Sequence, residues 1–564
     1  MGVNVVQGVS RRGFLGASAA AGAFVFIGVE TPASAAEGLA DFPAAVPVHR
    51  EVYRNWDGVV VTDALWTCVP RQSADVVAVV NWAHQHGYTV RAQGYRHTWS
   101  PLTVATGTAA DSKVILLDTT KALTAMSLVG SRRVRVQAGA SMENLLSYLS
   151  SKNFSLVATP APGGITVAGA LAINGHGTAL PALGEKPLPG QNFGTVSNLV
   201  VELTAVVWDQ ASGRYQERTF SRSDTECKAF LTHLGRAFIT EVVLQVVDDY
   251  NIRCRNRTDI ASSELFAAPE AVTDRSLSKL IDAYGRVGII WYAFTDRPWV
   301  QIWEPSPNRP LLSRPTLTPY NYLFADNLPT PVPQLLGQLV AGQDWVAPAF
   351  GNAILLATDT GLTALGARDM WGKSKNFLNW VKPTTLRVTA GSHAVVTSRA
   401  NLQKVVHDFT SFYSAKLAEY QAQGKFPVNS ALEIRITGVD DPTQIDVPGA
   451  EAPALSAARP VEGHPEWDIA VWLDLVTLPD TPHQNEFYSE LEQYFRRLPA
   501  ELGVARPEWA KRFAHTPAGA WTDTTAMQDE IPATLPEWDW TVSTLNKYDP
   551  HRLFSNPLID QLLN

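Results

Sequence analysis

The chain has 564 residues, which is more than one compact hydrophobic core accommodates, so two or more domains are expected. Hydrophobic residues make up 45% of the chain and charged residues 18%, and these proportions exclude a disordered protein. The formal net charge of −8 argues against a nucleic-acid partner, because such a partner requires a clustered basic surface.

The N-terminus has the features of an export signal. Residues 10–15, with the sequence SRRGFL, resemble the twin-arginine pattern, and they are followed by an apolar stretch over 16–29 and a small-residue cleavage site at 33–35. A membrane anchor is the alternative, but the apolar stretch is shorter than the about 20 residues that span a bilayer. We therefore expect a signal peptide over residues 1–35 and a secreted protein, extracellular or periplasmic.

The first half of the chain alternates short strands and helices from residue 66 to residue 247. Val76, Val79, Val80 and Ala83 share one face of a predicted helix over 73–86, with Ser73 as its N-cap and Gly87 as its C-cap. The other elements expected here are a helix over 141–149 and strands over 88–92, 114–117, 133–138, 199–208 and 242–247.

The second half of the chain differs in composition, because its predicted strands are rich in aromatic residues. We expect strands over 291–294, 299–303, 432–436 and 469–475. The proline-dense stretch over 305–333 predicts an irregular loop, either a lid or a surface connection. We expect a first domain over 36–250, a second over 251–524, and a C-terminal segment over 525–564 that returns to the first domain.

Three cysteines occur, Cys68, Cys227 and Cys254. An odd, sparse set of this kind is no disulfide framework, and none of the three has the spacing of a zinc ligand. We expect neither a disulfide nor a bound metal.

Four glycine-bearing junctions occur in the first domain, over 93–100, 138–141, 160–177 and 234–240, and the first two follow predicted strands. Glycine lets the backbone approach a ligand closely, and successive N–H groups form an anion-binding concavity. A diphosphate that passes between backbone loops needs such junctions. No G-x-G-x-x-G opens a βαβ unit, so ordinary dinucleotide binding is not indicated.

Taken together, these junctions resemble the FAD domain of the vanillyl-alcohol oxidase superfamily. By itself a histidine such as His97 is more often structural, but the resemblance implies a covalent bond from His97 to the 8α carbon of the flavin. The chain has no cysteine in the 160–177 junction, so a single link is implied. The fold class implied is α+β, with a vanillyl-alcohol-oxidase-type (PCMH) FAD-binding domain and a substrate domain built on a large antiparallel sheet.

The resemblance also assigns the residues that bind the cofactor. His176 is equally compatible with packing in its Gly-His-Gly context. The residues expected to contact FAD, besides His97, are Arg91, Gly94, Tyr95, Arg96, Thr98, Gly139, Pro162, Gly163, Gly164, Gly169, Asn174, Gly175, His176, Gly177, Gly235 and Ile239.

The second half of the chain resembles one particular family within this superfamily. The stretches at 291–299, 325–329, 371–374, 395–401, 433–435, 506–511 and 547–554 are similar to those of the covalent-flavin (type II) cholesterol oxidases. This similarity extends from about residue 50 to the C-terminus.

The match implies catalytic residues in the second domain. Glu433 and Arg435 are two apart on a predicted strand, so their side chains share a side; without the resemblance, a surface ion pair is the default interpretation. In the family such a pair faces the flavin, where arginine can stabilise developing negative charge. Lys511 matches a lysine near the flavin ring. Glu264 matches a carboxylate over the active site that is suited to moving a proton during isomerisation.

Two positions depart from the family pattern. The close relatives carry a glutamate at the position of Ala390 and an asparagine at the position of Asp474. Strand alternation puts Asp474 on the same side as Trp472, but it does not decide between the active site and solvent. If Asp474 faces the site, we expect it to protonate or to pair with Arg435 or Lys511, and to take part in catalysis.

The sequence therefore predicts a secreted oxidase with covalent FAD that converts the 3β-hydroxyl of a cholesterol-like sterol to a ketone with release of H2O2. Isomerisation of the Δ5 to the Δ4 double bond is expected to follow. The alternatives are a polyol or sugar-lactone oxidase of the same superfamily and a non-enzymatic sterol-binding protein. The 17 tryptophans favour an apolar polycyclic substrate over a polyol. The expected partners are the sterol and O2, with transient contact to sterol-bearing membranes or micelles and no obligate protein partner.

Overall fold

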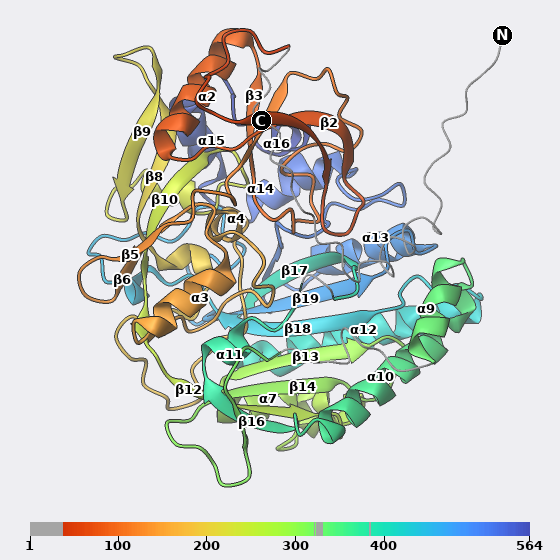
Figure 1. The fold of residues 1–564 in the computed structure, drawn as a ribbon. Coiled ribbons are helices and arrows are strands. Elements are labelled where there is room, and N and C mark those ends of the chain that lie inside the picture. Colours follow the sequence, from red (N-terminus) through yellow and green to blue (C-terminus); the bar gives the residue numbers. More distant parts are fainter. Residues whose placement is uncertain (1–37, 321, 323–330, 383–384) are drawn as a thin grey trace, which may run out of the picture.

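The computed structural model describes residues 38–320, 322, 331–382 and 385–564 (Figure 1). Three main β-sheets with their covering helices form the molecule. The predicted signal peptide over 1–35 lies outside the described residues. Within them, no helix is both long and apolar enough to cross a bilayer.

The first sheet has four strands in the order β1 (Val48–Arg54), β2 (Val61–Cys68), β4 (Val114–Asp118), β3 (Thr89–Gln93). Helix α2 (Ser73–His86) packs its predicted apolar face against it, and Gly87 ends the helix in the left-handed region at φ 69°. The expected cap at Ser73 is wrong. The N-cap is Gln72, and the Ser73 hydroxyl donates instead to Glu217 on a neighbouring strand.

The second sheet is antiparallel and has five strands. Helix α3 (Met142–Ser151) and the short helix α4 (Val167–Ala172) pack on it, and the side chains of Ser141 and Thr166 cap these helices. The strand order is β5 (Met126–Leu128), β6 (Arg133–Gln137), β10 (Phe238–Gln245), β8 (Val200–Asp209), β9 (Arg214–Ser221). A two-stranded ladder of β7 (Phe154–Ser155) and β11 (Val247–Asp248) lies beside it.

The third sheet has nine strands and is antiparallel except where β15 pairs with β16. Its order is β15 (Arg314–Thr316), β16 (Asp369–Lys373), β12 (Asn251–Arg257), β14 (Trp299–Pro305), β13 (Arg286–Tyr292), β18 (Ala431–Gly438), β19 (Ile469–Thr477), β17 (Thr389–Thr397), β20 (Val504–Pro507).

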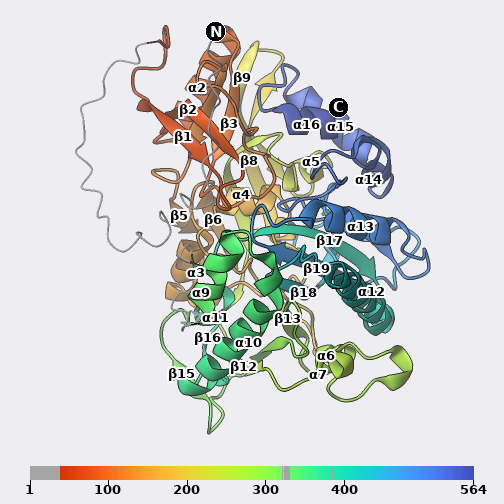
Figure 2. The same cartoon turned by 90° about the vertical axis from the view of Figure 1, so that its right-hand side faces the viewer.

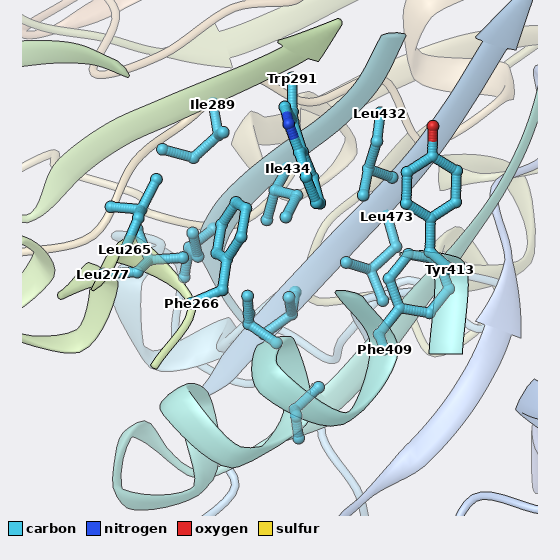
Figure 3. Close-up of a cluster of buried hydrophobic side chains, with 14 of the residues drawn as sticks. Leu265, Phe266, Leu277, Ile289, Trp291, Phe409, Tyr413, Leu432, Ile434 and Leu473 are labelled. Atoms are coloured by element: carbon cyan, nitrogen blue, oxygen red, sulfur yellow. The ribbon is translucent and has the colours of Figure 1, made fainter. Parts of the chain in front are cut away.

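Helices cover one face of this nine-stranded sheet. Alternate residues of β18, such as Leu432 and Ile434, pack there against Phe409 and Tyr413 of the long helix α12 (Figure 3). This apolar core leaves Glu433 and Arg435 on the opposite face. The helices on the covered face are α6 (Ser262–Leu265), α7 (Leu277–Tyr284), α12 (Leu402–Ala422) and α13 (Gln484–Arg496).

The end of the chain returns to the first two sheets. The Leu553 carbonyl accepts from the Val90 amide at 2.8 Å, and Asp549 accepts from Tyr215 and Arg236. Figure 2 shows α15 and α16 at the same end of the molecule as β1 and β2. The remaining helices are α5 (Cys227–Leu231), α9 (Val332–Val340), α10 (Ala347–Ala364), α11 (Lys375–Leu378), α14 (Ile531–Ala533), α15 (Trp538–Tyr548) and α16 (Pro557–Leu562).

The α+β fold class is confirmed, and the expected strands overlap observed ones. The proline-dense stretch over 305–333 contains β15, the start of α9 and residues outside the described part. The long helices α10 and α12 were not anticipated. The three cysteines are buried and free, and no cluster suited to a metal occurs in the described part of the chain. The domain division stays a prediction.

Candidate active site

A cavity of about 400 Å³ lies among the three sheets. The loop that follows β3, the loop that precedes β10 and the 160–176 junction line one part of it, and strands β13, β18 and β19 with helix α10 line another. Its size falls in the range of small-molecule sites, and its wall is mostly apolar.

The loop after β3 brings His97 to the cavity wall. The His97 ring lies between two indoles, 4.8 Å from Trp56 and 5.6 Å from Trp99 by ring centroids. Burial, reinforced by the positive charges of Lys511 and Arg387, lowers the pKa of His97 to about 4. No hydrogen bond to either ring nitrogen comes from the described residues. His97 is therefore a neutral imidazole with a free nitrogen lone pair.

Most of the residues expected to bind the cofactor line this cavity. Arg91 is buried and donates to the carbonyls of Thr103 and Gly235, so it holds the wall together as well as lining it. The predicted residues found on the cavity wall are Arg91, Gly94, Tyr95, Arg96, His97, Thr98, Pro162, Gly169, Gly175, His176, Gly235 and Ile239.

Five predicted cofactor residues do not line the cavity: Gly139, Gly163, Gly164, Asn174 and Gly177. A Cβ on Gly139 would overlap the Thr119 carbonyl, and one on Gly177 would overlap the Thr159 carbonyl. The Asn174 amide accepts from the Ala457 N–H at 2.8 Å and donates to Thr195. Gly139 and Gly177 thus allow loops to pack closely behind the wall, and the contact of these five residues with the cofactor stays a prediction.

The wall next to His97 suits a long, flat ligand held by backbone. Glycines and alanines predominate along it, so backbone atoms are accessible from the cavity. Gly235 adopts φ +80°, and its lack of a Cβ leaves room for the Arg91 guanidinium beside it. His233, also on the wall, has a buried Nε2 without a hydrogen-bond partner in the described structure. These features fit the FAD that the sequence predicts.

Three ionisable side chains meet on the cavity face of strands β18 and β19. The Arg435 guanidinium donates to the Glu433 carboxylate and, at 2.6 Å, to Oδ2 of Asp474. Asp474 is fully buried, and Ser392 on β17 donates to its other oxygen. Asp474 therefore lies on the cavity side of β19, directly behind Arg435, rather than in solvent, and its part in catalysis stays a prediction.

A second charged group comes from the chain just after β20. Lys511 Nζ lies 3.4 Å from Asp474 Oδ2 and 3.6 Å from Glu508 Oε1, and 4.6 Å from the centre of the Trp99 ring. Glu508 also lies 3.5 Å from His176 Nε2. The two groups form one buried ion cluster of Glu433, Arg435, Asp474, Glu508 and Lys511.

His176 both packs against a strand and lines the cavity. Its ring stacks on Trp472 with centroids 3.6 Å apart, so it packs against β19. It also lines the cavity between the FAD-side loops and the ion cluster.

The cluster shifts the pKa of its members in opposite directions. Burial and the nearby Glu508 raise the pKa of Asp474 to about 6. Burial alone would raise the pKa of Glu508, but Lys511 and His176 outweigh it and hold that pKa well below its usual range. Likewise Asp474 and Glu508 overcome the burial of Lys511 and raise its pKa. Of these two carboxylates, Asp474 is therefore the one whose pKa is shifted towards neutrality.

The expected position of Glu264 over the active site is wrong. Glu264 does not line the cavity; its carboxylate accepts from Thr273 and lies 3.4 Å from Arg275. Its neighbour Phe266 packs on Trp291 in the core beneath the helices (Figure 3). The nine-stranded sheet separates Glu264 from the ion cluster.

The sequence analysis missed Glu508 as a site residue, although its stretch was singled out. The available signal was its spacing of three residues from Lys511. Ala390, the other departure, is buried beside the cavity wall, and its carbonyl accepts from the Arg512 N–H.

Comparison with known proteins is informative for both halves of the chain. Residues 251–564 match the family model described as cholesterol oxidase, substrate-binding, and residues 65–185 match the FAD binding domain model. The structure of a solvent-stable cholesterol oxidase is 46% identical with a TM-score of 0.91, covering 93% of this chain and 99% of that one. Cholesterol oxidase from Brevibacterium sterolicum is 40% identical with a TM-score of 0.90, covering 95% and 100%.

A more distant structure has the same fold. Xylooligosaccharide oxidase from Myceliophthora thermophila is 11% identical with a TM-score of 0.53, covering 90% of this chain and 93% of that one. No curated protein sequence is a significant match to this chain.

We expect Asp474→Asn to change the pH dependence of substrate-driven flavin reduction. As pH rises through about 6, Asp474 ionises and offsets the positive charge of Arg435 and Lys511. The asparagine variant keeps that charge, so above pH 6 it should reduce flavin faster, by up to about tenfold, and below pH 5 the two proteins should agree. Stopped-flow reduction across pH measures this. Superimposable profiles would contradict it.

The same substitution affects stability with a definite sign. The folded pKa of Asp474 lies above its unfolded value, so its contribution is fully present below pH 3.8 and is lost as pH rises through about 6. The free energy of unfolding of the asparagine variant should lack this dependence on pH. Denaturant unfolding of both proteins at pH 4 and pH 7 measures the difference.

Proposed function

Because this chain belongs to the cholesterol oxidase family, we propose that it oxidises the 3β-hydroxyl of cholesterol-like sterols to a 3-ketone and reduces O2 to H2O2. The alcohol loses two electrons and two protons, and O2 gains them. The observation that carries the proposal is a single cavity whose wall combines the FAD-side loops, the buried ion cluster and an apolar end. A coupled peroxidase assay with cholesterol tests it.

The apolar end of the cavity favours a sterol over a polyol. Its wall is formed by uncharged and mostly apolar side chains, so a polyol there would leave most of its hydroxyls without partners. The lining residues at this end include Ile290, Trp299, Ile354, Trp380, Leu386, Val388 and Val476. The alternative of a polyol or sugar-lactone oxidase is therefore not favoured.

The ion cluster is suited to stabilise an oxyanion. FAD, when bound, supplies the acceptor for the two electrons and passes them to O2. Arg435 is held by carboxylates on both sides, so its guanidinium is fixed and permanently charged where the C3 oxygen loses its proton. Lys511 adds a second positive charge from the other wall. Glu433 and the Asp474–Glu508 pair are the groups that take up the proton.

We also propose covalent attachment of FAD through His97. Its imidazole is neutral, faces the cavity and has no competing hydrogen bond from the described residues, so its lone pair is available to form a bond. Trp56 and Trp99 restrict the orientation of the ring.

The His97→Ala variant should contain FAD that denaturation releases, whereas wild-type flavin should stay with the precipitated protein. Oxidase activity should fall but not vanish, because the rest of the cavity still binds the cofactor. Absorbance of the supernatant after acid precipitation measures the attachment. His233→Ala, which removes another wall histidine, is the control. Release of wild-type flavin would disprove the link.

Arg435→Ala should lower turnover by about 100-fold or more, since it removes a fixed charge at a developing oxyanion. Steady-state H2O2 formation measures kcat. Arg253→Ala is the control, because Arg253 forms a comparable pair with Asp369 far from the cavity. A kcat near wild type would exclude the catalytic role.

Isomerisation of the Δ5 to the Δ4 double bond is a further part of the proposal, and it needs a base that faces the substrate. Glu433 lines the cavity, and besides the oxygen that pairs with Arg435 it has a second one with no hydrogen-bond partner among the described residues. Glu264 does not line the cavity, and both of its oxygens have partners. We therefore propose Glu433, in place of Glu264, as the base for isomerisation.

Glu433→Gln should therefore accumulate the unconjugated 5-en-3-one while still forming H2O2, and Glu264→Gln should give the wild-type ratio of products. Chromatography of the steroid products with absorbance of the conjugated enone distinguishes the two variants. Unchanged conjugated product from Glu433→Gln would remove Glu433 from this step.

A further inference from the structure

The apolar end of the cavity contains a pair of hydroxyl groups. Tyr292, at the end of β13, and Thr358, on α10, both line the cavity, and their oxygens are 3.1 Å apart. Ser430 adds a third hydroxyl to the wall nearby, where its carbonyl accepts from Ala293 next to Tyr292. Ile290 and Ile354 add apolar side chains to this part of the wall, and the Glu433 carboxylate is close enough to contribute to the raised pKa of Tyr292.

One hydroxyl proton of this pair has no acceptor within the pair. Each hydroxyl can donate one hydrogen bond, and the bond between Tyr292 and Thr358 uses only one of the two protons. No second acceptor for either hydroxyl occurs among the described residues. Tyr322, a neighbouring phenol on the same wall, differs because its hydroxyl donates to Asn256 at 3.0 Å. A buried donor without an acceptor is costly, which points to a ligand.

The register of the sheet sets the distance from this pair to the ion cluster. Arg435 is opposite Gly288, and Tyr292 is opposite Ala431, so four residues separate the two positions along β13 and β18. At about 3.3 Å per residue this is about 13 Å. In a steroid that carries an oxygen on ring D, that oxygen and the C3 oxygen are separated by a comparable length.

We propose that Tyr292 and Thr358 form a second polar subsite, which donates a hydrogen bond to an oxygen on ring D, or on the first side-chain carbons, of a 3β-hydroxysteroid. This inference rests on the proposed oxidation of C3 at the ion cluster. A carbonyl oxygen fits best, because it only accepts and the pair has a proton to give. Steroids with such an oxygen are preferred over otherwise identical steroids without one.

The size of this preference follows from the bond that is gained. A substrate with an apolar ring D leaves the donor unpaired, whereas a ketone satisfies it. One hydrogen bond of this kind corresponds to about three- to tenfold in kcat/KM.

The test compares dehydroepiandrosterone, which has a ketone on ring D, with its 17-deoxy analogue. We expect wild-type protein to favour the ketone, and Tyr292→Phe to lower the ratio of the two kcat/KM values by about three- to tenfold. Thr358→Val removes the group that orients the phenol and should lower the ratio in the same direction. Tyr322→Phe is the matched control and should leave the ratio unchanged.

A binding measurement separates this inference from the proposed function. Tryptophan fluorescence gives the affinities of androst-4-ene-3,17-dione and androst-4-en-3-one without turnover, and Tyr292→Phe should weaken only the former. If wild type oxidises neither steroid, the proposed function fails while the binding ratio still tests the subsite. Equal losses for both steroids in Tyr292→Phe, or an equal drop in Tyr322→Phe, would overturn the subsite.

Discussion

The site depends on the mutual neutralisation of five ionisable side chains buried at the contact between the nine-stranded sheet and the FAD-side loops. An isolated charge in that position would cost several kcal/mol, so each member needs its partners. Arg435 is held between Glu433 and Asp474, and Lys511 between Asp474 and Glu508. Asp474 belongs to both pairs and joins them, so the two cations are fixed relative to each other.

The strand period of two makes this arrangement possible. On β18, the even-numbered residues Leu432 and Ile434 enter the helix-covered core, and the odd-numbered residues Glu433 and Arg435 face the cavity. Movement of the charged residues would thus require the register of β18 against β13 and β19 to slip, which would expose the apolar core. The core beneath the helices therefore positions the charged groups, although none of its residues contacts the cavity.

Sequence reasoning succeeded where function depends on local pattern. Strand spacing predicted that Glu433 and Arg435 share a side, and the family resemblance of the glycine-bearing junctions assigned His97 to the cofactor; all three residues line the cavity. Sequence reasoning failed where tertiary packing determines the position of a residue. The family pattern assigned Glu264 to the active site, but in the structure the nine-stranded sheet lies between Glu264 and the cavity. Asn174 and Gly139 belong to the expected junctions but are not part of the cavity wall, because contacts between loops engage them instead. Contacts of this kind between distant parts of the chain produce no periodic pattern in the sequence.

Asp474 shows how one substitution in a buried cluster affects the whole of it. With a neutral residue there, the cluster would have two cations and two carboxylates, which balance. Asp474 adds a third carboxylate, and burial with the nearby Glu508 raises its pKa to about 6, so a bound proton restores the balance below that pH. Above it, the cluster carries an extra negative charge at the place where the substrate oxygen must become negative. The residue that joins the two cations thus also determines the pH range over which they are available to the substrate.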